Sequence, residues 1–291
     1  MGKMGKTNFS QQPENGRLNQ KEEGIHLSIA IQKIVTDSFA MRYFRFGTGG
    51  RTMVILPGLS IKSVMDSASA VAFEYAVMKN DFTVYVFDRR ENLPARYPVY
   101  EMARDTAAAI RSLGLKDIYL FGASQGGMIA QVIAIEYPDL VKKLALGSTV
   151  CRLPENGVLD RWTALARERN GEELFFDFLR AIYPPDEFEK YRNVVGMAAR
   201  MVTEEDFARF VILAEGSDGF DVSERLKEIQ CPVLAIGSED DAVLGGEGTR
   251  EIVRQLGDRP DVASYMYEGY GHAAFDTAPD YRKRLYRFFM E

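Results

Sequence analysis

A serine set between glycines is the feature of this chain that most suggests chemistry. The pentapeptide Gly-Ala-Ser-Gln-Gly at residues 122–126 follows an apolar, strand-like run and leads at once into a helical segment. A serine with glycines two positions to either side, between a strand and a helix, is the pattern of a nucleophile elbow. A Cβ at Gly122 or Gly126 would crowd the neighbouring strand or helix in so sharp a turn. We therefore expect the Ser124 hydroxyl to lie at the carboxyl edge of a sheet, beside a helix N-terminus that favours negative charge.

A serine hydroxyl is a poor nucleophile until a base takes its proton, and histidine is the usual base because its pKa lies near neutrality. The chain has two histidines, His26 and His272. His26 lies in a polar N-terminal stretch ahead of the first expected strand. His272 lies in a glycine-rich loop between the strand-like residues 263–267 and a C-terminal helix. We therefore predict that His272 is the base for Ser124.

A carboxylate that orients the imidazole is expected after the strand that precedes this loop. Residues 231–237 have the composition of a short buried strand, and Glu239, Asp240 and Asp241 follow it. Any of these three carboxylates could orient the ring and stabilise its charged form. Counting three residues from the end of the strand points to Asp240.

Taken together, these features resemble the α/β-hydrolase fold superfamily from about residue 39 to the C-terminus. The matching segments are Leu56-Pro57-Gly58-Leu59, the elbow, Ile236-Gly237 with its acidic cluster, and Gly271-His272. The resemblance implies a mostly parallel eight-stranded α/β sheet with helices on both faces and a helical lid inserted after the sixth strand. It also implies the chain order nucleophile, acid, histidine and two-step acyl transfer through an acyl-enzyme.

The resemblance adds two expectations about the site. Related hydrolases carry the acid in an Asp-x-Val/Ile-x-Pro/Gly phrase, which residues 241–245 fit, so Asp241 is preferred and Asp240 is the alternative. An oxyanion hole is implied from two backbone N–H groups, that of Gln125 and one from the loop after the third strand, for which we choose Leu59. Many relatives have His-Gly in that loop, where this chain has Pro57-Gly58.

The pattern along the chain predicts three regions. Residues 1–24 are polar and are expected to form a flexible arm. In residues 25–150 and 221–291, strand-like and helical segments alternate, which is typical of a parallel sheet covered on both faces. Residues 151–220 have helical spacing without strand-like runs and are interpreted as the lid. The expected strands include 27–35, 39–46, 51–56 and 82–88, and helical spacing covers 63–78 and 99–113.

Composition narrows the class of partner. The net charge of −6 and the pI near 5.3 argue against nucleic acid, because phosphate binding needs clustered Lys and Arg. No apolar run approaches the roughly 20 residues of a membrane helix, and no secretory signal is apparent, so a cytoplasmic location is expected. Cys151 and Cys231 are expected to be free thiols, and no metal or cofactor is expected. A monomer or a homodimer fits equally well.

The leading hypothesis is a cofactor-free serine hydrolase, a carboxylesterase that acts on small to medium apolar esters, since the lid segment is rich in aromatic residues. A carbon–carbon bond hydrolase or a thioesterase of the same fold is an alternative. A ligand-binding sensor or scaffold that retains the triad is an alternative of another class. Arg89 and Arg90, after the expected strand at 82–88, could bind an anionic group, but local ion pairs that fix the loop are the favoured interpretation.

Overall fold

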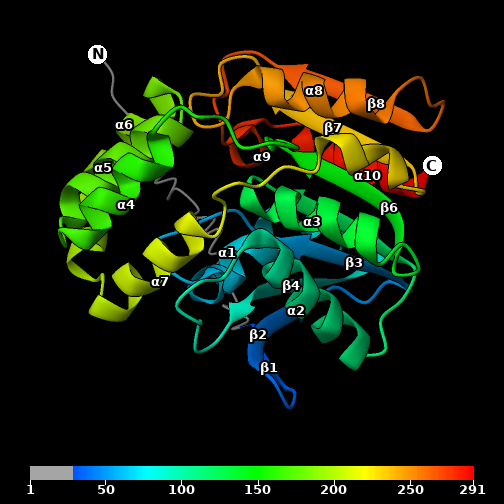
Figure 1. The fold of residues 1–291 in the computed structure, drawn as a ribbon, viewed down its shortest axis with the longest axis horizontal. Coiled ribbons are helices and arrows are strands. Elements are labelled where there is room, and N and C mark those ends of the chain that lie inside the picture. Colours follow the sequence, from blue (N-terminus) through cyan, green and yellow to red (C-terminus); the bar gives the residue numbers. More distant parts are fainter. Residues whose placement is uncertain (1–28) are drawn as a thin grey trace, which may run out of the picture.

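The computed structural model describes residues 29–291, in which eight strands form one sheet with helices on both faces (Figure 1). The strand order is β1-β2-β4-β3-β5-β6-β7-β8. β1 and β2 pair antiparallel, as do β2 and β4, and all other neighbours are parallel. The strands are β1 (Ile31–Val35), β2 (Ala40–Phe46), β3 (Arg51–Leu56), β4 (Phe82–Arg90), β5 (Ile118–Ala123), β6 (Val141–Gly147), β7 (Val233–Ser238) and β8 (Val262–Tyr267). The predicted fold class is confirmed.

The central strands are apolar throughout because both of their faces are buried. In β5, Leu120 belongs to the hydrophobic core on one face of the sheet, and Phe121 to the core on the other. The first core is completed by α2 (Val99–Ser112), α3 (Gln125–Glu136) and α8 (Gly246–Leu256), and the second by α1 (Ala68–Glu74) and α10 (Tyr281–Met290). This arrangement holds the ends of the strands rigidly.

Residues 63–78 have the helical spacing expected, but they do not form one continuous helix. They form η1 (Val64–Ser67), α1 and η2 (Ala76–Met78) in succession. The Ser63 hydroxyl accepts a hydrogen bond from the Met65 amide (3.2 Å), which starts a tight 3₁₀ turn in place of an α-helix. The short pieces let the chain curve around the loop that follows β3.

Four helices lie between β6 and β7 and form a group beside the sheet, at the left of Figure 1. They are α4 (Val158–Arg167), α5 (Gly171–Ile182), α6 (Pro185–Arg200) and α7 (Glu204–Glu215). The ring of Phe178 in α5 packs against Trp162 of α4, with centroids 4.6 Å apart, and lies 6.3 Å from the ring of Phe210 in α7. Their role as a lid stays a prediction, and the predicted arm at residues 1–24 lies outside the described residues, as does His26.

The parallel strands bring distant segments to one edge of the sheet. Strands β3, β5, β7 and β8 run in the same direction, so the segments that follow their carboxyl ends meet there. These segments carry Leu59, Ser124, Asp241 and His272, each after a different strand. The crevice outside the carboxyl ends of parallel strands is where α/β proteins bind their ligands.

Candidate functional site

Ser124 lies in the sharp turn between β5 and α3. Its backbone has φ 53° and ψ −124°, a conformation that side chains other than glycine rarely adopt. A Cβ at Gly122 would lie 2.3 Å from the Gly126 carbonyl oxygen, and one at Gly126 would lie 2.0 Å from that of Leu56. The two glycines therefore allow the strand and the helix to approach closely enough to form the turn. The Ser124 amide donates to the Gly147 carbonyl (2.8 Å), which fixes the turn to β6.

His272 and Asp241 form a buried pair. His272 Nδ1 lies 2.8 Å from Asp241 Oδ2, and both side chains are almost completely buried. Asp241 Oδ1 accepts from the amides of Val243 (2.8 Å) and Leu244 (2.9 Å), so both carboxylate oxygens are fixed. Burial by itself would raise the pKa of Asp241, but the His272 ring and these amides outweigh it and lower that pKa below its ordinary value. The carboxylate is therefore ionised at neutral pH and can accept a hydrogen bond from an Nδ1–H group of His272.

Asp240 makes different contacts. Its Oδ1 accepts from the Gly269 amide (2.9 Å) and its Oδ2 from the Gly271 amide (3.0 Å), both in the loop that carries His272. The third carboxylate of the cluster, Glu239, pairs with Arg250 on the surface. Of the three candidates, the structure brings Asp241 to the imidazole and uses Asp240 to hold the histidine loop.

The loop after β3 packs directly against the elbow. A Cβ at Gly58 would lie 3.1 Å from the Ser124 Cβ and 3.6 Å from its Oγ, so this backbone borders the hydroxyl. Arg89 Nη2 donates to the Pro57 carbonyl (2.9 Å) and to Gln125 Oε1 (3.2 Å). Within residues 29–291, neither the Leu59 amide nor the Gln125 amide donates to another protein group. Both donors are therefore available to a ligand.

Arg89 and Arg90 are engaged within the protein, in agreement with the interpretation favoured from the sequence. Arg89 is buried, which lowers its pKa to about 10, and it lies behind the loop and outside the cavity lining. Arg90 Nη1 pairs with Asp105 (3.2 Å) on α2. The preceding Asp88 pairs with Arg209 of α7 and accepts from the Ser63 hydroxyl (2.5 Å). The cluster fixes the loops behind the elbow.

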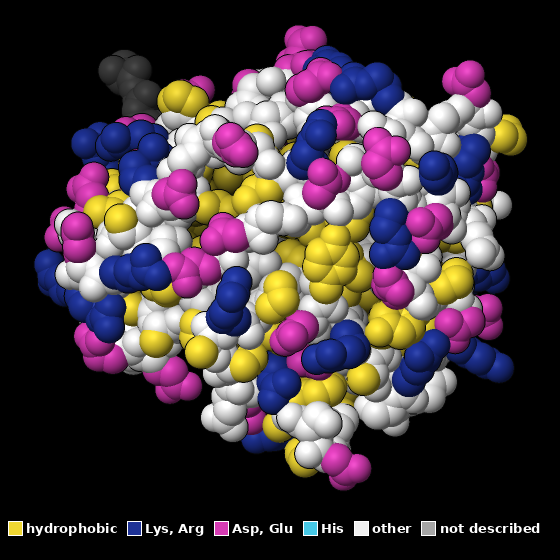
Figure 2. Space-filling view, viewed as in Figure 1, with side chains coloured by type: hydrophobic (Ala, Val, Ile, Leu, Met, Phe, Trp, Pro, Cys, Tyr) yellow, Lys and Arg dark blue, Asp and Glu magenta, His cyan; other side chains and the backbone are white. Residues whose placement is uncertain are grey.

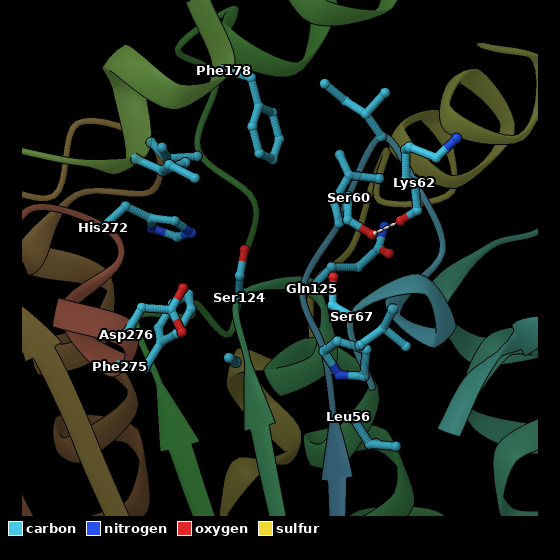
Figure 3. A pocket seen from close by; sticks show the side chains of 18 of the residues that line it. Leu56, Ser60, Lys62, Ser67, Ser124, Gln125, Phe178, His272, Phe275 and Asp276 are labelled. Carbon is cyan, nitrogen blue, oxygen red and sulfur yellow. Dashed lines mark hydrogen bonds between the residues drawn. The ribbon is translucent and has the colours of Figure 1, made fainter. Parts of the chain in front are cut away.

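A cavity of about 500 Å³ opens above Ser124. In Figure 3 the His272 ring points toward the Ser124 hydroxyl from one side, and Gln125, Ser60 and Lys62 lie on the other. The part of the wall formed by α4 and α5 is apolar and aromatic, which gives a pocket of the size that takes small organic ligands. That part consists of Leu159, Trp162, Phe175, Phe178, Leu179 and Ile182.

The same cavity contains a carboxylate that the sequence did not single out. Asp276, in the short helix α9 (Ala274–Thr277), lines the wall next to His272, and Figure 3 shows its carboxylate on the side of the cavity where Ser124 and His272 lie. Limited hydration raises the pKa of Asp276 to about 6. The sequence signal was slight, an Asp four residues after the histidine, and no motif marks it.

The described residues also bear on the expectations about metal-binding groups, membrane-spanning helices and free thiols. Within residues 29–291, no group of three or more His, Cys, Asp or Glu side chains could hold a metal ion. In the same part of the chain, no helix is both long enough and apolar enough to cross a membrane. Cys151 and Cys231 are free thiols whose pKa values burial raises, to about 12 and about 11. On the face seen in Figure 2, basic and acidic side chains are interspersed.

Comparison with known proteins agrees with the fold described above. A family model described as "alpha/beta hydrolase fold" matches residues 51–279. Among curated proteins, the chain is 24% identical over 237 residues to the mouse serine hydrolase BPHL, which covers 75% of this chain and 72% of that protein. It is 25% identical over 248 residues to a protein of Caulobacter sp. strain K31 that carries the carbamate hydrolase name RutD, covering 79% of this chain and 87% of the relative.

Solved structures share the fold at lower identity. The α/β hydrolase MGS-M2 from a Medee basin deep-sea metagenome library has a TM-score of 0.78 and 20% identity, covering 89% of this chain and 98% of that chain. The enol-lactonase from Burkholderia xenovorans LB400 has a TM-score of 0.77 and 17% identity, covering 89% of this chain and 100% of that chain. At 20% and 17% identity, the similarity to these two structures supports the fold alone.

Proposed function

Because the chain belongs to the alpha/beta hydrolase fold family, we propose that it is a serine hydrolase that cleaves carboxylic esters with small to medium apolar groups. One observation carries the proposal. Ser124, in a strained elbow, lines the same cavity as His272, and Asp241 lies 2.8 Å from His272 Nδ1. We assign these three side chains, which come from three different loops, the roles of nucleophile, base and orienting carboxylate.

In the proposed reaction, Ser124 Oγ attacks the ester carbonyl carbon while His272 Nε2 takes the hydroxyl proton. Asp241 holds the other ring nitrogen, Nδ1, as a proton donor and stabilises the imidazolium that forms. The tetrahedral intermediate then collapses, the carbon–oxygen bond to the alcohol breaks, and His272 returns the proton to the departing alcohol. A water molecule, activated by His272 in the same way, hydrolyses the acyl-enzyme and restores Ser124.

The developing negative charge needs donors that are already in place. The amides of Leu59 and Gln125 are proposed for this role, since they belong to the two segments that flank the Ser124 hydroxyl and have no partner within residues 29–291. Removing one such donor in comparable enzymes raises the barrier by about 3 kcal/mol. The Arg89 guanidinium supports the geometry because it bonds to both segments.

The nature of the cavity supports an ester with apolar groups. Its wall from α4 and α5 carries the aromatic and aliphatic side chains named above. Relatives are named as a serine hydrolase, a carbamate hydrolase and an enol-lactonase. Each of these names denotes a hydrolytic enzyme, so a substrate panel should include an ester, a lactone, a carbamate and a thioester.

Labelling with a fluorophosphonate probe tests the nucleophile. Wild type should be labelled, and Ser124→Ala should fold normally and take up no label. Ser112→Ala is the control, because within residues 29–291 its hydroxyl bonds only to the Ala109 carbonyl at the end of α2 and lies outside the cavity lining. Labelling of Ser124→Ala at the wild-type rate would contradict the assignment.

Turnover of p-nitrophenyl esters from acetate to octanoate separates an esterase from a sensor. The proposal expects turnover that depends on chain length and disappears in Ser124→Ala. A flat response near background, together with tight binding of an unreactive ligand, would favour the sensor. Faster cleavage of a thioester or of a carbon–carbon bond substrate than of any ester would change the reaction class but keep the same nucleophile.

A further inference from the structure

Asp276 is a charged cavity-lining group that the hydrolytic mechanism does not use, and its nearest countercharge among the described residues, Arg282, lies 3.9 Å away. Three lining side chains can carry charge, namely Lys62, His272 and Asp276. Lys62 Nζ lies 3.1 Å from Asp206 Oδ2 and is thereby paired, and His272 is held by Asp241. The Asp276 side chain is 45% exposed and lines the cavity, so a ligand in the cavity can contact it.

The nearest cation is shared with a second carboxylate. Arg282 Nη2 lies 3.0 Å from Glu74 Oε2 but 3.9 Å from Asp276 Oδ1. Its Nη1 donates to the backbone carbonyl of Asp276 (3.1 Å), not to the carboxylate. One guanidinium therefore faces two carboxylates, and these three groups together carry one excess negative charge when both carboxylates are ionised.

The remaining polar contact of this carboxylate is weak. The Tyr183 hydroxyl, at the end of α5, lies 3.5 Å from Asp276 Oδ2, at the limit of a hydrogen bond. The cavity that Asp276 lines is also lined by three aromatic side chains, Tyr75, Tyr183 and Phe275. Phe275 precedes Asp276 in the chain, and the Tyr183 hydroxyl is the one that lies 3.5 Å from its carboxylate. Aromatic rings beside a carboxylate attract a cation through both its charge and its contact with the ring faces.

We propose that Asp276 binds an ammonium group of the substrate, so that the enzyme prefers an ester carrying a primary amine to a neutral ester of the same length. This inference rests on the proposed hydrolase function and names the substrate class of the same site. The amine would donate hydrogen bonds to the Asp276 carboxylate, which lacks a close donor, while the apolar part of the substrate lies against the α4 and α5 side chains. A charge-assisted hydrogen bond in a partly dehydrated site gives this kind of selectivity.

The selectivity should depend on pH. The pKa of Asp276 is raised to about 6, chiefly because the surrounding side chains limit hydration of the carboxylate even though part of it is exposed; Glu74 raises it further, and Arg282, Tyr183 and His272 oppose the shift. The carboxylate is ionised at pH 8 and mostly protonated at pH 5. Preference for the charged ester should therefore be present at pH 8 and lost as the pH falls through about 6.

Matched pairs of methyl esters test the proposal. Methyl 3-aminopropanoate is compared with methyl butanoate, and methyl 6-aminohexanoate with methyl heptanoate, by pH-stat at pH 8 and pH 5. The measured quantity is the ratio of kcat/KM within a pair, which cancels any pH effect on the catalytic groups that both esters share. In at least one pair wild type should favour the amine, and Asp276→Asn should reduce that ratio about tenfold or more.

Asp66→Asn is the control variant. Asp66 is an exposed carboxylate on η1 and lies outside the cavity lining, so its removal changes the net charge equally but leaves the subsite intact. Its selectivity ratio should match that of wild type. Circular dichroism and thermal unfolding check that Asp276→Asn folds, and the pH dependence of the wild-type ratio tests the subsite without any substitution.

A binding experiment separates this proposal from the proposed function. Hexylammonium and hexan-1-ol are titrated calorimetrically into Ser124→Ala and into Ser124→Ala/Asp276→Asn. Hexylammonium should bind about tenfold or more weakly to the double variant, and hexan-1-ol equally to both. If no ester is hydrolysed but this difference is found, the hydrolase function fails and the ammonium site stands. Equal hexylammonium affinity in both proteins, or a selectivity ratio unchanged in Asp276→Asn, overturns the ammonium site.

Discussion

A hydrogen bond of 3.2 Å joins the guanidinium of Arg89 to the side-chain oxygen of Gln125. The same Arg89 nitrogen donates to the Pro57 carbonyl (2.9 Å). The Gln125 side-chain nitrogen continues the network to the Leu213 carbonyl (2.6 Å) and the Ser217 hydroxyl (2.9 Å). One buried arginine thus fixes the two segments proposed to supply the oxyanion donors and ties them to the end of α7.

Replacing Arg89 should therefore disturb catalysis without removing any reacting group. In Arg89→Met the Pro57 carbonyl and the Gln125 oxygen lose their donor, which costs about 1–3 kcal/mol in a buried site. We expect kcat for p-nitrophenyl butyrate to fall about tenfold or more while KM changes little, because positioning of the oxyanion donors matters most in the transition state.

The neighbouring arginine supplies the control for this prediction. Arg90 bonds to Asp105 and to the Ser38 carbonyl, away from the elbow. Arg90→Met should lower the temperature of unfolding but leave kcat near the wild-type value. Equal losses of kcat in the two variants would mean that Arg89 has only a general structural role.

The two adjacent aspartates should separate chemistry from loop support. Asp241→Asn keeps the size of the side chain but removes the acceptor that holds the His272 ring, so kcat should fall by about 10⁴-fold, as happens when a triad carboxylate is lost. Asp240→Asn leaves that contact intact and weakens bonds to the Gly269 and Gly271 amides. It should lower stability by about 1–2 kcal/mol, with a much smaller effect on kcat. A larger loss of kcat in Asp240→Asn than in Asp241→Asn would reverse the assignment.

Gly58 should be required because of the space beside the nucleophile. An alanine Cβ there would lie 3.1 Å from the Ser124 Cβ, closer than side chains usually pack, and in van der Waals contact with its Oγ at 3.6 Å. Gly58→Ala should fold but react with a fluorophosphonate at least about tenfold more slowly, because the added methyl group shifts or shields the hydroxyl. At Gly50 an added Cβ would meet nothing within 4 Å, so Gly50→Ala is the matched control. Equal labelling rates in both variants would exclude steric crowding at Ser124.

The fold could be predicted from the sequence because its signals are local and repeated. The apolar runs of β3 to β7 and the glycines around Ser124 each reflect a constraint of a parallel sheet or a sharp turn. The choice between Asp240 and Asp241 could not be made from local pattern alone, because it depends on which carboxylate faces a ring 31 residues later in the chain. The sequence pattern limited the choice to two adjacent aspartates, and Asp241 is the one that contacts His272 in the structure.

The network behind the site lies beyond local pattern for the same reason. Arg89 bonds to a glutamine 36 residues away, and Asp88 pairs with Arg209 across a separation of 121 residues. Asp276 gives no motif, since its importance comes from the cavity it lines and from an arginine already paired with Glu74. Such relationships depend on the packing of loops and inserted helices, which short patterns do not encode.

The ionisation of Asp276 should also be visible in protein stability. Its pKa is raised from the ordinary 3.8 to about 6 in the folded protein, so folding favours the protonated form. The stability contributed by the neutral acid is fully present below about pH 4 and is lost as the pH rises through about 6.

Asparagine mimics the neutral acid at every pH. Asp276→Asn should therefore raise the temperature of unfolding relative to wild type at pH 8 but not at pH 4, measured by scanning calorimetry. A difference for Asp276→Asn that stays constant with pH would mean that folding does not raise the pKa of this carboxylate. An increase at pH 8, together with lost preference for charged esters, would indicate that the protein maintains a destabilising carboxylate in its cavity because ligand binding requires it.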